Sequence, residues 1–161
     1  MQNLEKLPIA IRQINASDID SIMSILNEVA HQVPINLSTP QHIAAMRRQI
    51  HDHYLTEFSL VAINENGMVV GFQLAKRMCW NGDMYIHLAY AAVTTRAAGN
   101  KVFRQLIKAE KLFGLPLVAE VKAENKGAMV DRLRRYHFQP FAAAHTDSEH
   151  TLRWDPTQPK T

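Results

Sequence analysis

"VTTRAAGNKVF", residues 93–103, places a glycine between a short apolar run and an amphipathic helix pattern, in a chain with only 6 glycines. A loop that leads from a strand into a helix exposes backbone N–H groups without helical partners, and the helix dipole adds partial positive charge there. Residues 97–99 are Ala, Ala and Gly, so an anion can approach those N–H groups closely. Arg96 and Lys101 supply full charges at the rims. The stretch predicts a loop that binds a polyanion. The alternative is that Gly99 only permits the turn and the basic side chains are solvated.

The flanking sequence predicts a strand, a helix and a second strand around this loop. Residues 83–93, "DMYIHLAYAAV", are strand-like. Gly114 and Pro116 predict the end of the helix, and "LVAEVKA" (117–123) predicts the second strand. One apolar face runs along the helix, with Val102, Phe103, Leu106, Ile107 and Phe113. A strand, crossover helix and strand of this kind form a right-handed parallel unit.

Upstream, the chain predicts a strand, two helices and two further strands. "IAIRQI" (9–14) alternates like a strand, and Ser17 precedes a helical stripe of Ile19, Ile22, Met23, Leu26, Val29 and Ala30. Thr39 is an N-cap with Pro40 at the first helical position. The second helix carries Ile43, Met46, Ile50 and Tyr54 on one face. Two strands, 58–63 and 68–77, then precede 83–93, separated by "NENG" and "WNGD", whose Asn-Gly pairs favour tight hairpins.

Downstream, Asn125 is a candidate cap for a fourth helix with Met129, Leu133 and Tyr136 turned inward, and 138–144 and 150–154 predict a final antiparallel pair. The predicted order is βααβββαβαββ. We therefore expect an α/β (α+β) fold with a mixed, mostly antiparallel twisted sheet of about six to seven strands and about four helices. Residues 1–154 are expected to form a single domain, and 155–161 a flexible C-terminal tail.

Composition limits the function classes. The chain has 161 residues, of which 47% are hydrophobic and 20% charged, as in an ordinary globular domain. A net charge of +3 suits an anionic ligand but is too mild to indicate a nucleic-acid partner. The single cysteine, Cys79, excludes an internal disulfide. No long apolar run predicts a membrane span, and Glu5 and Lys6 interrupt the start of the chain where a signal peptide is apolar. We expect a cytoplasmic protein.

The element order and the glycine loop together resemble the GNAT acyltransferases, which use acyl-coenzyme A. Members carry an Arg/Gln-x-x-Gly-x-Gly/Ala loop between their fourth strand and third helix, and its amides hold the coenzyme's pyrophosphate. The resemblance covers residues 9–154 and includes "IRQINASDIDSI" and "NENGMVVGF". It implies acetyl-CoA as co-substrate, no metal, and coenzyme contacts from Val93, Thr94, Thr95, Arg96, Ala97, Ala98, Gly99, Asn100, Lys101 and Asn125. The sequence departs from the family at Lys101, where members have Gly or Ala, and a lysine there can pair with a phosphate or obstruct it.

Three side chains are candidates for the proton transfers of acyl transfer, and two of them, His87 and Glu120, are candidates for the base. His87 stands six residues before Val93 in the predicted fourth strand, where some members of the family keep a carboxylate base, and its unperturbed pKa of about 6.5 suits proton transfer near neutrality. Glu120 lies inside the apolar run 117–123 and is a candidate second base. The alternatives are a histidine packed within the sheet and, since Lys122 and Glu124 share the alternation phase of Glu120, a solvated strand face.

The family's usual general acid is a tyrosine on the fourth helix, in a pattern like Asn-x-x-Ala-x-x-x-Tyr. Asn125 and Ala128 match it, but Arg132 or Leu133 stands at the tyrosine position. Tyr136 is the nearest hydroxyl, about one turn too late, and an apolar core role is its alternative. A thiolate is a good leaving group that can take its proton from water, so this departure does not exclude catalysis.

Other polar clusters carry weaker signals. His51 and His53, two positions apart, point to different sides of a helix and do not readily share a metal. The basic run Arg132, Arg134 and Arg135 can reach a distal phosphate of the coenzyme or line a solvated helix face.

Three functions follow for such a chain. The first is an N-acyltransferase that transfers an acetyl group from acetyl-CoA to a small-molecule or peptide amine by direct attack in a ternary complex. The second is a catalytically silent acyl-CoA-binding or protein-interaction module of the same fold. The third is a structural protein without a nucleotide ligand. The sequence leaves the acceptor and a homodimer open.

Overall fold

The computed structural model describes residues 9–29, 36–94, 99–120, 126–140 and 151–156. Its elements are β1 (Ala10–Gln13), a 3₁₀ turn (Ala16–Asp18), α1 (Ile19–Glu28), α2 (Pro40–His53), β2 (Leu60–Ile63), β3 (Val69–Trp80), β4 (Asp83–Val93), α3 (Gly99–Lys111), β5 (Leu117–Glu120), α4 (Lys126–Arg135), β6 (Gln139–Pro140) and β7 (Thr151–Trp154). The predicted order of strands and helices is confirmed. Within the described ranges, no helix is both long and apolar enough to cross a bilayer.

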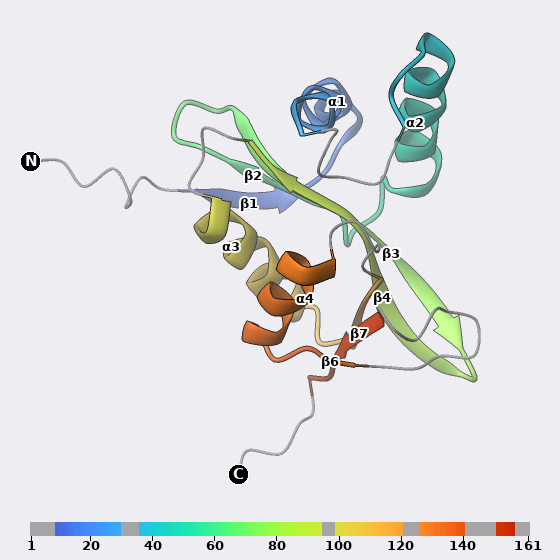
Figure 1. The fold of residues 1–161 in the computed structure, drawn as a ribbon, viewed down its shortest axis with the longest axis vertical. Helices are drawn as coiled ribbons and strands as arrows, with labels where there is room; N and C mark the ends of the chain where they lie inside the picture. Colours follow the sequence, from blue (N-terminus) through green and yellow to red (C-terminus); the bar gives the residue numbers. More distant parts are fainter. Residues whose placement is uncertain (1–8, 30–35, 95–98, 121–125, 141–150, 157–161) are drawn as a thin grey trace, which may run out of the picture.

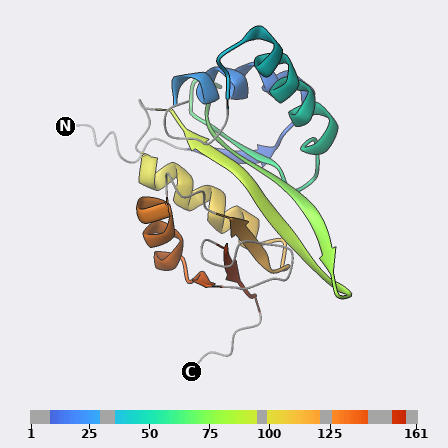
Figure 2. The same ribbon diagram turned by 45° about the vertical axis from the view of Figure 1, so that its right-hand side comes forward.

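The described strands form one sheet in the order β1-β2-β3-β4-β5-β7-β6 (Figure 1). β4 and β5 run parallel, and the other neighbouring strands run antiparallel. α3 connects the two parallel strands, as predicted for the sequence around the glycine loop. β3 and β4 form a long hairpin that extends beyond the adjacent strands (Figures 1 and 2).

Helices cover the sheet on both sides (Figures 1 and 2). α1 and α2 pack on one face, which we call the α1/α2 face, over a core that includes Ile22, Leu26, Ile50, Phe72 and Leu74. α3 and α4 pack on the opposite face, over a core that includes Ile86, Leu88, Ile107, Leu117 and Phe138. Since β-strand side chains alternate between faces, these two cores determine which residues each strand presents to either side.

Local sequence explains several element boundaries. Thr39 caps α2 by accepting a hydrogen bond from the His42 amide at 3.1 Å, and Pro40 occupies the first turn. The β3–β4 hairpin turns at Asn81 and Gly82, with φ of 52° and 80°. Two consecutive positive φ values are those of a type I′ turn, which an Asn-Gly pair adopts at little cost.

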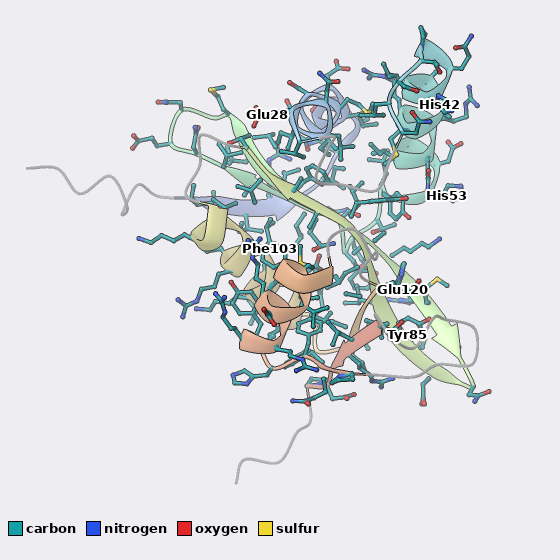
Figure 3. The ribbon with its side chains drawn as sticks, in the orientation of Figure 1. Glu28, His42, His53, Tyr85, Phe103 and Glu120 are labelled. Carbon is teal, nitrogen blue, oxygen red and sulfur yellow. The ribbon has the colours of Figure 1, made fainter. Side chains whose placement is uncertain are left out.

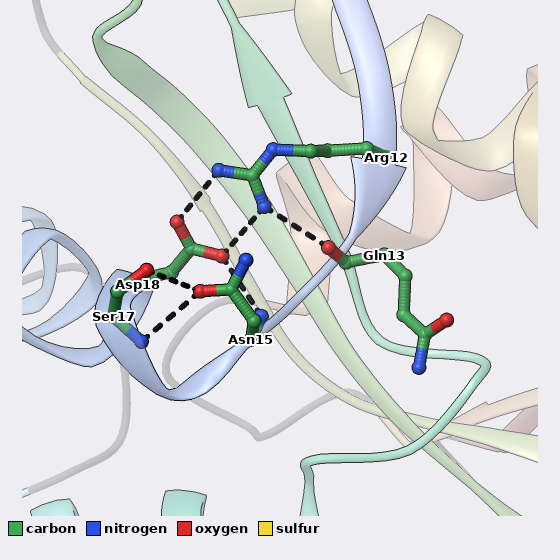
Figure 4. A network of polar contacts seen from close by, with 5 residues as sticks. All are labelled: Arg12, Gln13, Asn15, Ser17 and Asp18. Carbon is green, nitrogen blue, oxygen red and sulfur yellow. Dashed lines mark hydrogen bonds and ion pairs between the residues drawn. The ribbon is translucent and has the colours of Figure 1, made fainter.

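The start of α1 is fixed by a buried carboxylate (Figure 4). Asp18, 4% exposed, accepts two hydrogen bonds from the Arg12 guanidinium, both at 2.8 Å, and one from the Asn15 amide at 2.9 Å. The Asn15 side chain accepts in turn from the Ser17 amide and from the Asp18 amide, and the second of these bonds completes a capping box. This network ties the end of β1 to the first turn that leads into α1.

The predicted position of Phe113 on the buried helix face is wrong. Phe113 lies beyond the last residue of α3, Lys111, and is partly exposed instead of on the buried helix face. The chain leaves the helix through Gly114 at φ of 79°, a conformation that glycine accommodates. Phe113 instead contacts Phe58 edge to face, with ring centroids 4.9 Å apart.

Candidate active site

An irregularity in β4 shapes the centre of the sheet. Leu74 of β3 pairs with Tyr90 and the next residue, Ala75, pairs with Leu88, so Ala89 is an additional residue on β4. Such a bulge shifts the alternation of side chains by one residue. Tyr85 and His87 before the bulge therefore lie on the same α1/α2 face as Tyr90 and Ala92 after it.

Within the described residues, the ladder between β4 and β5 covers three residue pairs. It joins Ile86–Leu88 to Leu117–Ala119. β4 continues to Val93, whereas described β5 ends at Glu120. Within the described part of the chain, the β5-side edge of 90–93 takes no part in this ladder, and an edge of this kind can hydrogen-bond an extended ligand.

His87 and Glu120 meet where this ladder ends. His87 Nε2 lies 3.6 Å from Glu120 Oε1, and the two side chains are 22% and 43% exposed. His87 is paired with Val118, two residues before Glu120 on β5, so both side chains project from the α1/α2 face. The structure thus brings together two candidates that stand 33 positions apart in the sequence. A histidine beside a carboxylate can accept a proton and have the resulting imidazolium stabilised.

Tyr85, two residues before His87 on β4, and Arg153 of β7, which is paired with Val118, project from the same face as this pair; Figure 3 labels Tyr85 and Glu120. Tyr85 is buried, and burial raises the pKa of its hydroxyl; the Glu120 charge raises this pKa further, while Arg153 opposes the rise. The Arg153 Nε donates to Asp155 at 3.0 Å. The tyrosine hydroxyl therefore stays protonated at neutral pH and can donate a hydrogen bond.

Aromatic side chains lie beside the bulge. The rings of Tyr54 and Tyr90 meet edge to face with centroids 6.0 Å apart, and the Lys76 ammonium lies 5.8 Å from the centroid of Tyr54. Burial, reinforced by Tyr90, raises the pKa of Tyr54 despite a hydrogen bond with Gln49. Tyr54, Tyr90 and Lys76 therefore form a cluster of two aromatic rings and one ammonium group, and Lys76 is the cross-strand neighbour of His87.

The predicted coenzyme loop is described only at its ends. Val93 ends β4, and the Thr94 amide donates to the Val70 carbonyl at 2.9 Å. Gly99 begins α3, and Lys101 is exposed in its first turn. Asn100 follows Gly99 in α3, and the other predicted contacts, Thr95, Arg96, Ala97, Ala98 and Asn125, lie outside the described residues.

Tyr136 and His87 lie on opposite faces of the sheet. Tyr136 lies beyond α4 and packs against Phe103 of α3, with ring centroids 6.0 Å apart, on the face opposite the α1/α2 face. Its carbonyl accepts from the Lys111 ammonium at 2.6 Å. The core role weighed for this tyrosine agrees with its packing.

The weaker sequence signals lie elsewhere. Within the described ranges no group of three His, Cys, Asp or Glu side chains could hold a metal, and His51 Nδ1 lies 3.1 Å from the neighbouring Asp52. The Arg132 guanidinium lies 5.4 Å from the Phe103 centroid, whereas Arg134 and Arg135 are exposed. Cys79 is exposed near the hairpin turn.

Sequence reasoning missed Lys76 and Tyr85, although the signal was present. A two-residue turn at Asn81-Gly82 pairs Trp80 with Asp83, and the antiparallel register then follows by counting outward. That count pairs Lys76 with His87, as the structure shows. The hairpin turn alone was therefore sufficient to find the lysine.

Comparisons with protein-family models and with curated sequences find no match. Among solved structures, a Corynebacterium glutamicum protein described as histone acetyltransferase HPA2 and related acetyltransferase is similar, with a TM-score of 0.67, 17% identity, and 95% of this chain and 99% of that chain covered. Arabidopsis thaliana Naa50, in complex with the bisubstrate analogue CoA-Ac-MVNAL, has a TM-score of 0.63 and 11% identity, with 91% of this chain and 98% of that chain covered.

A third similar structure is much longer. It is a fungal multi-domain GH3 β-N-acetylglucosaminidase with a GCN5-related glucosamine N-acetyltransferase region; the TM-score is 0.67 and the identity 11%, with 86% of this chain and only 18% of that chain covered. At such identities, the likeness establishes a shared fold. Together with the strand order and the parallel β4–β5 pair, it shows that the chain has the fold of the GNAT acetyltransferases.

Proposed function

We propose that the protein is an N-acyltransferase that transfers an acetyl group from acetyl-CoA to an amine by direct attack in a ternary complex. The observation that carries the proposal is the approach of His87 to Glu120, at the end of the described part of the β4–β5 ladder. In a GNAT fold this junction combines a proton acceptor with a strand edge suited to an extended thioester.

In this proposal His87 is the general base. The attacking amine must lose a proton as its nitrogen bonds to the carbonyl carbon, and His87 Nε2 accepts that proton directly or through one water. Glu120, 3.6 Å away, stabilises the imidazolium that forms. The C–S bond then breaks, and the departing thiolate is protonated by water or by a nearby hydroxyl.

Residues 93–101 and Asn125 are proposed to hold the coenzyme. The described ends of this segment fit a pyrophosphate, because α3 begins at Gly99, where helix amides lack internal partners and no Cβ blocks approach. Lys101, exposed on the first turn, would add positive charge. Val93 lies on the part of β4 beyond the β5 ladder and would offer backbone groups to the pantetheine arm.

The fold alone leaves the acceptor undecided. Naa50 was solved with an analogue that joins CoA to a peptide, whereas the fungal region is named for glucosamine. A small-molecule or peptide amine is therefore proposed for this chain. A silent acyl-CoA-binding module is the second candidate, favoured by Tyr136 lying away from His87.

Two measurements test the proposal. Acetyl-CoA should raise the melting temperature, because a ligand that binds only the native state stabilises it by mass action. Acetyl-CoA with a panel of amines should release free thiol, and His87→Ala should abolish most of this release while keeping the thermal shift. His53→Ala, an exposed histidine on α2, is the matched control. A thermal shift without thiol release for any amine supports the silent module, and the absence of both contradicts coenzyme binding.

A further inference from the structure

Lys76 lies directly beside the candidate base. It is paired with His87 across the β3–β4 ladder and projects from the same face of the sheet. Side chains opposite each other on an antiparallel pair have Cβ atoms about 5 Å apart. The Lys76 side chain is half-buried and its ammonium lies 5.8 Å from the Tyr54 ring centroid.

Two basic side chains at neighbouring positions, Arg77 on the opposite face of β3 and Arg153 on β7, have carboxylate partners. Arg77 donates to Glu57 at 3.1 Å, and Arg153 donates to Asp155 at 3.0 Å. Glu120, the carboxylate beside His87, lies on the β5 side of that histidine, away from β3. Within the described part of the chain, no carboxylate lies within ion-pair distance of Lys76.

A partly buried ammonium against an aromatic ring is favourable, but a cation at this depth also attracts an anion. A simple amine acceptor, cationic in solution, would be attracted by Glu120 and repelled by Lys76. An acceptor that carries its own carboxylate close to the amine satisfies both charges at once.

We infer that the acceptor is a free amino acid, whose amine faces His87 and Glu120 while its carboxylate binds the Lys76 ammonium. This inference rests on the proposed acyl transfer. A peptide N-terminus does not meet the same requirement, because its first carboxyl group is an amide and its free carboxylate lies far from the amine.

The test compares acceptors that differ only in the carboxylate. Thiol release from acetyl-CoA is measured with a set of amino acids, with their methyl esters and amides, with the corresponding decarboxylated amines, and with short peptides. The free amino acids should be preferred over their esters by about 10- to 100-fold in kcat/KM, the range for a hydrogen bond to a charged group.

Lys76→Met should remove this preference. The variant keeps the apolar stem against Tyr54, so kcat/KM for the free amino acid should fall by about 10- to 100-fold while that for the ester changes little. The KM for acetyl-CoA should stay unchanged. Lys108→Met, an exposed lysine on α3, is the control and should leave the amino acid preference intact. A merely structural role of Lys76 would lower the melting temperature of Lys76→Met but leave the acid-to-ester ratio unchanged.

Failure of the inference differs from failure of the proposed function. Turnover of peptides, esters or plain amines as fast as free amino acids, or an unchanged ratio in Lys76→Met, would overturn the inference and leave acyl transfer standing. If no amine releases thiol, calorimetric titration of the coenzyme-loaded protein with an amino acid and with its methyl ester decides. Binding of the acid alone, lost in Lys76→Met, supports the inference, and equal or absent binding of the two overturns it.

Discussion

Gly71 of β3 and Val102 of α3 approach each other so closely that a Cβ at Gly71 would lie 2.8 Å from Val102 Cγ1 and 3.3 Å from the Ala92 carbonyl oxygen. Real Cβ atoms do not reach the first of these distances. The glycine therefore lets the first turn of α3 pack closely on β3 and β4, next to the segment proposed to bind pyrophosphate.

Gly71→Ala should destabilise the fold by roughly 1–3 kcal/mol, because an added methyl group in a packed core displaces its neighbours. The melting temperature and the thermal shift with acetyl-CoA should both fall as α3 moves. Val102→Ala in the same chain should recover part of the loss, since it removes the clashing methyl group. Additive effects of the two substitutions would show that this contact does not position α3.

The contact between His87 and Glu120 predicts non-additive kinetics. His87→Ala should lower kcat by about 10²- to 10⁴-fold, the range for loss of a general base, and Glu120→Gln by a smaller factor. The double variant should be no slower than His87→Ala, because Glu120 acts through the imidazole. Initial rates of thiol release measure this cycle, with Glu57→Gln as a carboxylate control. If the fold-loss in kcat of the double variant equals the product of the two single losses, the two side chains act independently.

Glu110 predicts an unusual dependence of stability on pH. It is fully buried on α3, neither carboxyl oxygen has a hydrogen-bond partner among the described residues, and burial raises its pKa from 4.5 to about 9. The folded state holds a proton that the unfolded state releases above pH 4.5, so this group's contribution falls as pH rises from about 5 to 9. The free energy of unfolding should decrease by up to about 1.4 kcal/mol per pH unit.

Glu110→Gln should remove that slope, since an amide does not ionise. Denaturant unfolding at pH 5, 7 and 8.5 compares the two chains, and the variant should gain stability relative to the parent as pH rises. If the free energy of unfolding changes with pH equally in the parent and in Glu110→Gln, the carboxyl group at this position is not protonated in the folded state.

The ion pair between exposed Arg12 and buried Asp18 predicts the opposite trend in acid. Burial raises the pKa of Asp18, but the hydrogen bonds from Arg12 and the Asn15 amide, together with the Arg12 charge, outweigh it and hold the pKa below 3.8. Asp18→Asn should cost roughly 1–3 kcal/mol near neutrality. This difference should shrink as pH falls below about 4, where the unfolded carboxylate takes up a proton.

Asp20→Asn is the matched control for that prediction. Asp20 also pairs with an arginine, Arg47, but its side chain is 84% exposed against 5% for Asp18. An exposed pair of this kind contributes about 0–1 kcal/mol. Equal losses in the two variants would mean that burial does not strengthen the Asp18 pair.

Lys101 should assist coenzyme binding. An exposed lysine on the first turn of α3 adds to the positive potential of the helix start. Lys101→Ala should weaken acetyl-CoA binding by about 3- to 10-fold and reduce its salt dependence. Titration calorimetry at two salt concentrations measures both effects, with Lys108→Ala as the control. Tighter binding by Lys101→Ala would identify the lysine as an obstruction.

The sequence predicted most of the fold because its boundaries are local. The Thr39 cap with Pro40 and the turns after Asn64 and Asn81 each depend on a few neighbouring residues, and the structure confirms them. The end of α3 was placed too late because Phe113 continues the apolar spacing of the helix, whereas the helix already ends at Lys111 and Phe113 lies in the turn that leads to Gly114.

The candidate site was less accessible from sequence. His87 and Glu120 were each selected by residue type, but their contact depends on the parallel register between β4 and β5, which no local pattern encodes. The bulge at Ala89 was also missed, since an additional residue in an apolar strand leaves no signature in composition. Without it, alternation places His87 and Tyr90 on opposite faces.

Because of the bulge, the number of residues in β4 determines which side chains face the candidate site. If Ala89 were deleted, the strand could stay paired with β3 only by exchanging the two faces on one side of the deletion. Either the histidine would point beneath α3, or Tyr90 and Ala92 would leave the core below α1. No substitution elsewhere restores that parity, so the loss of Ala89 should be tolerated less well than a change of its side chain.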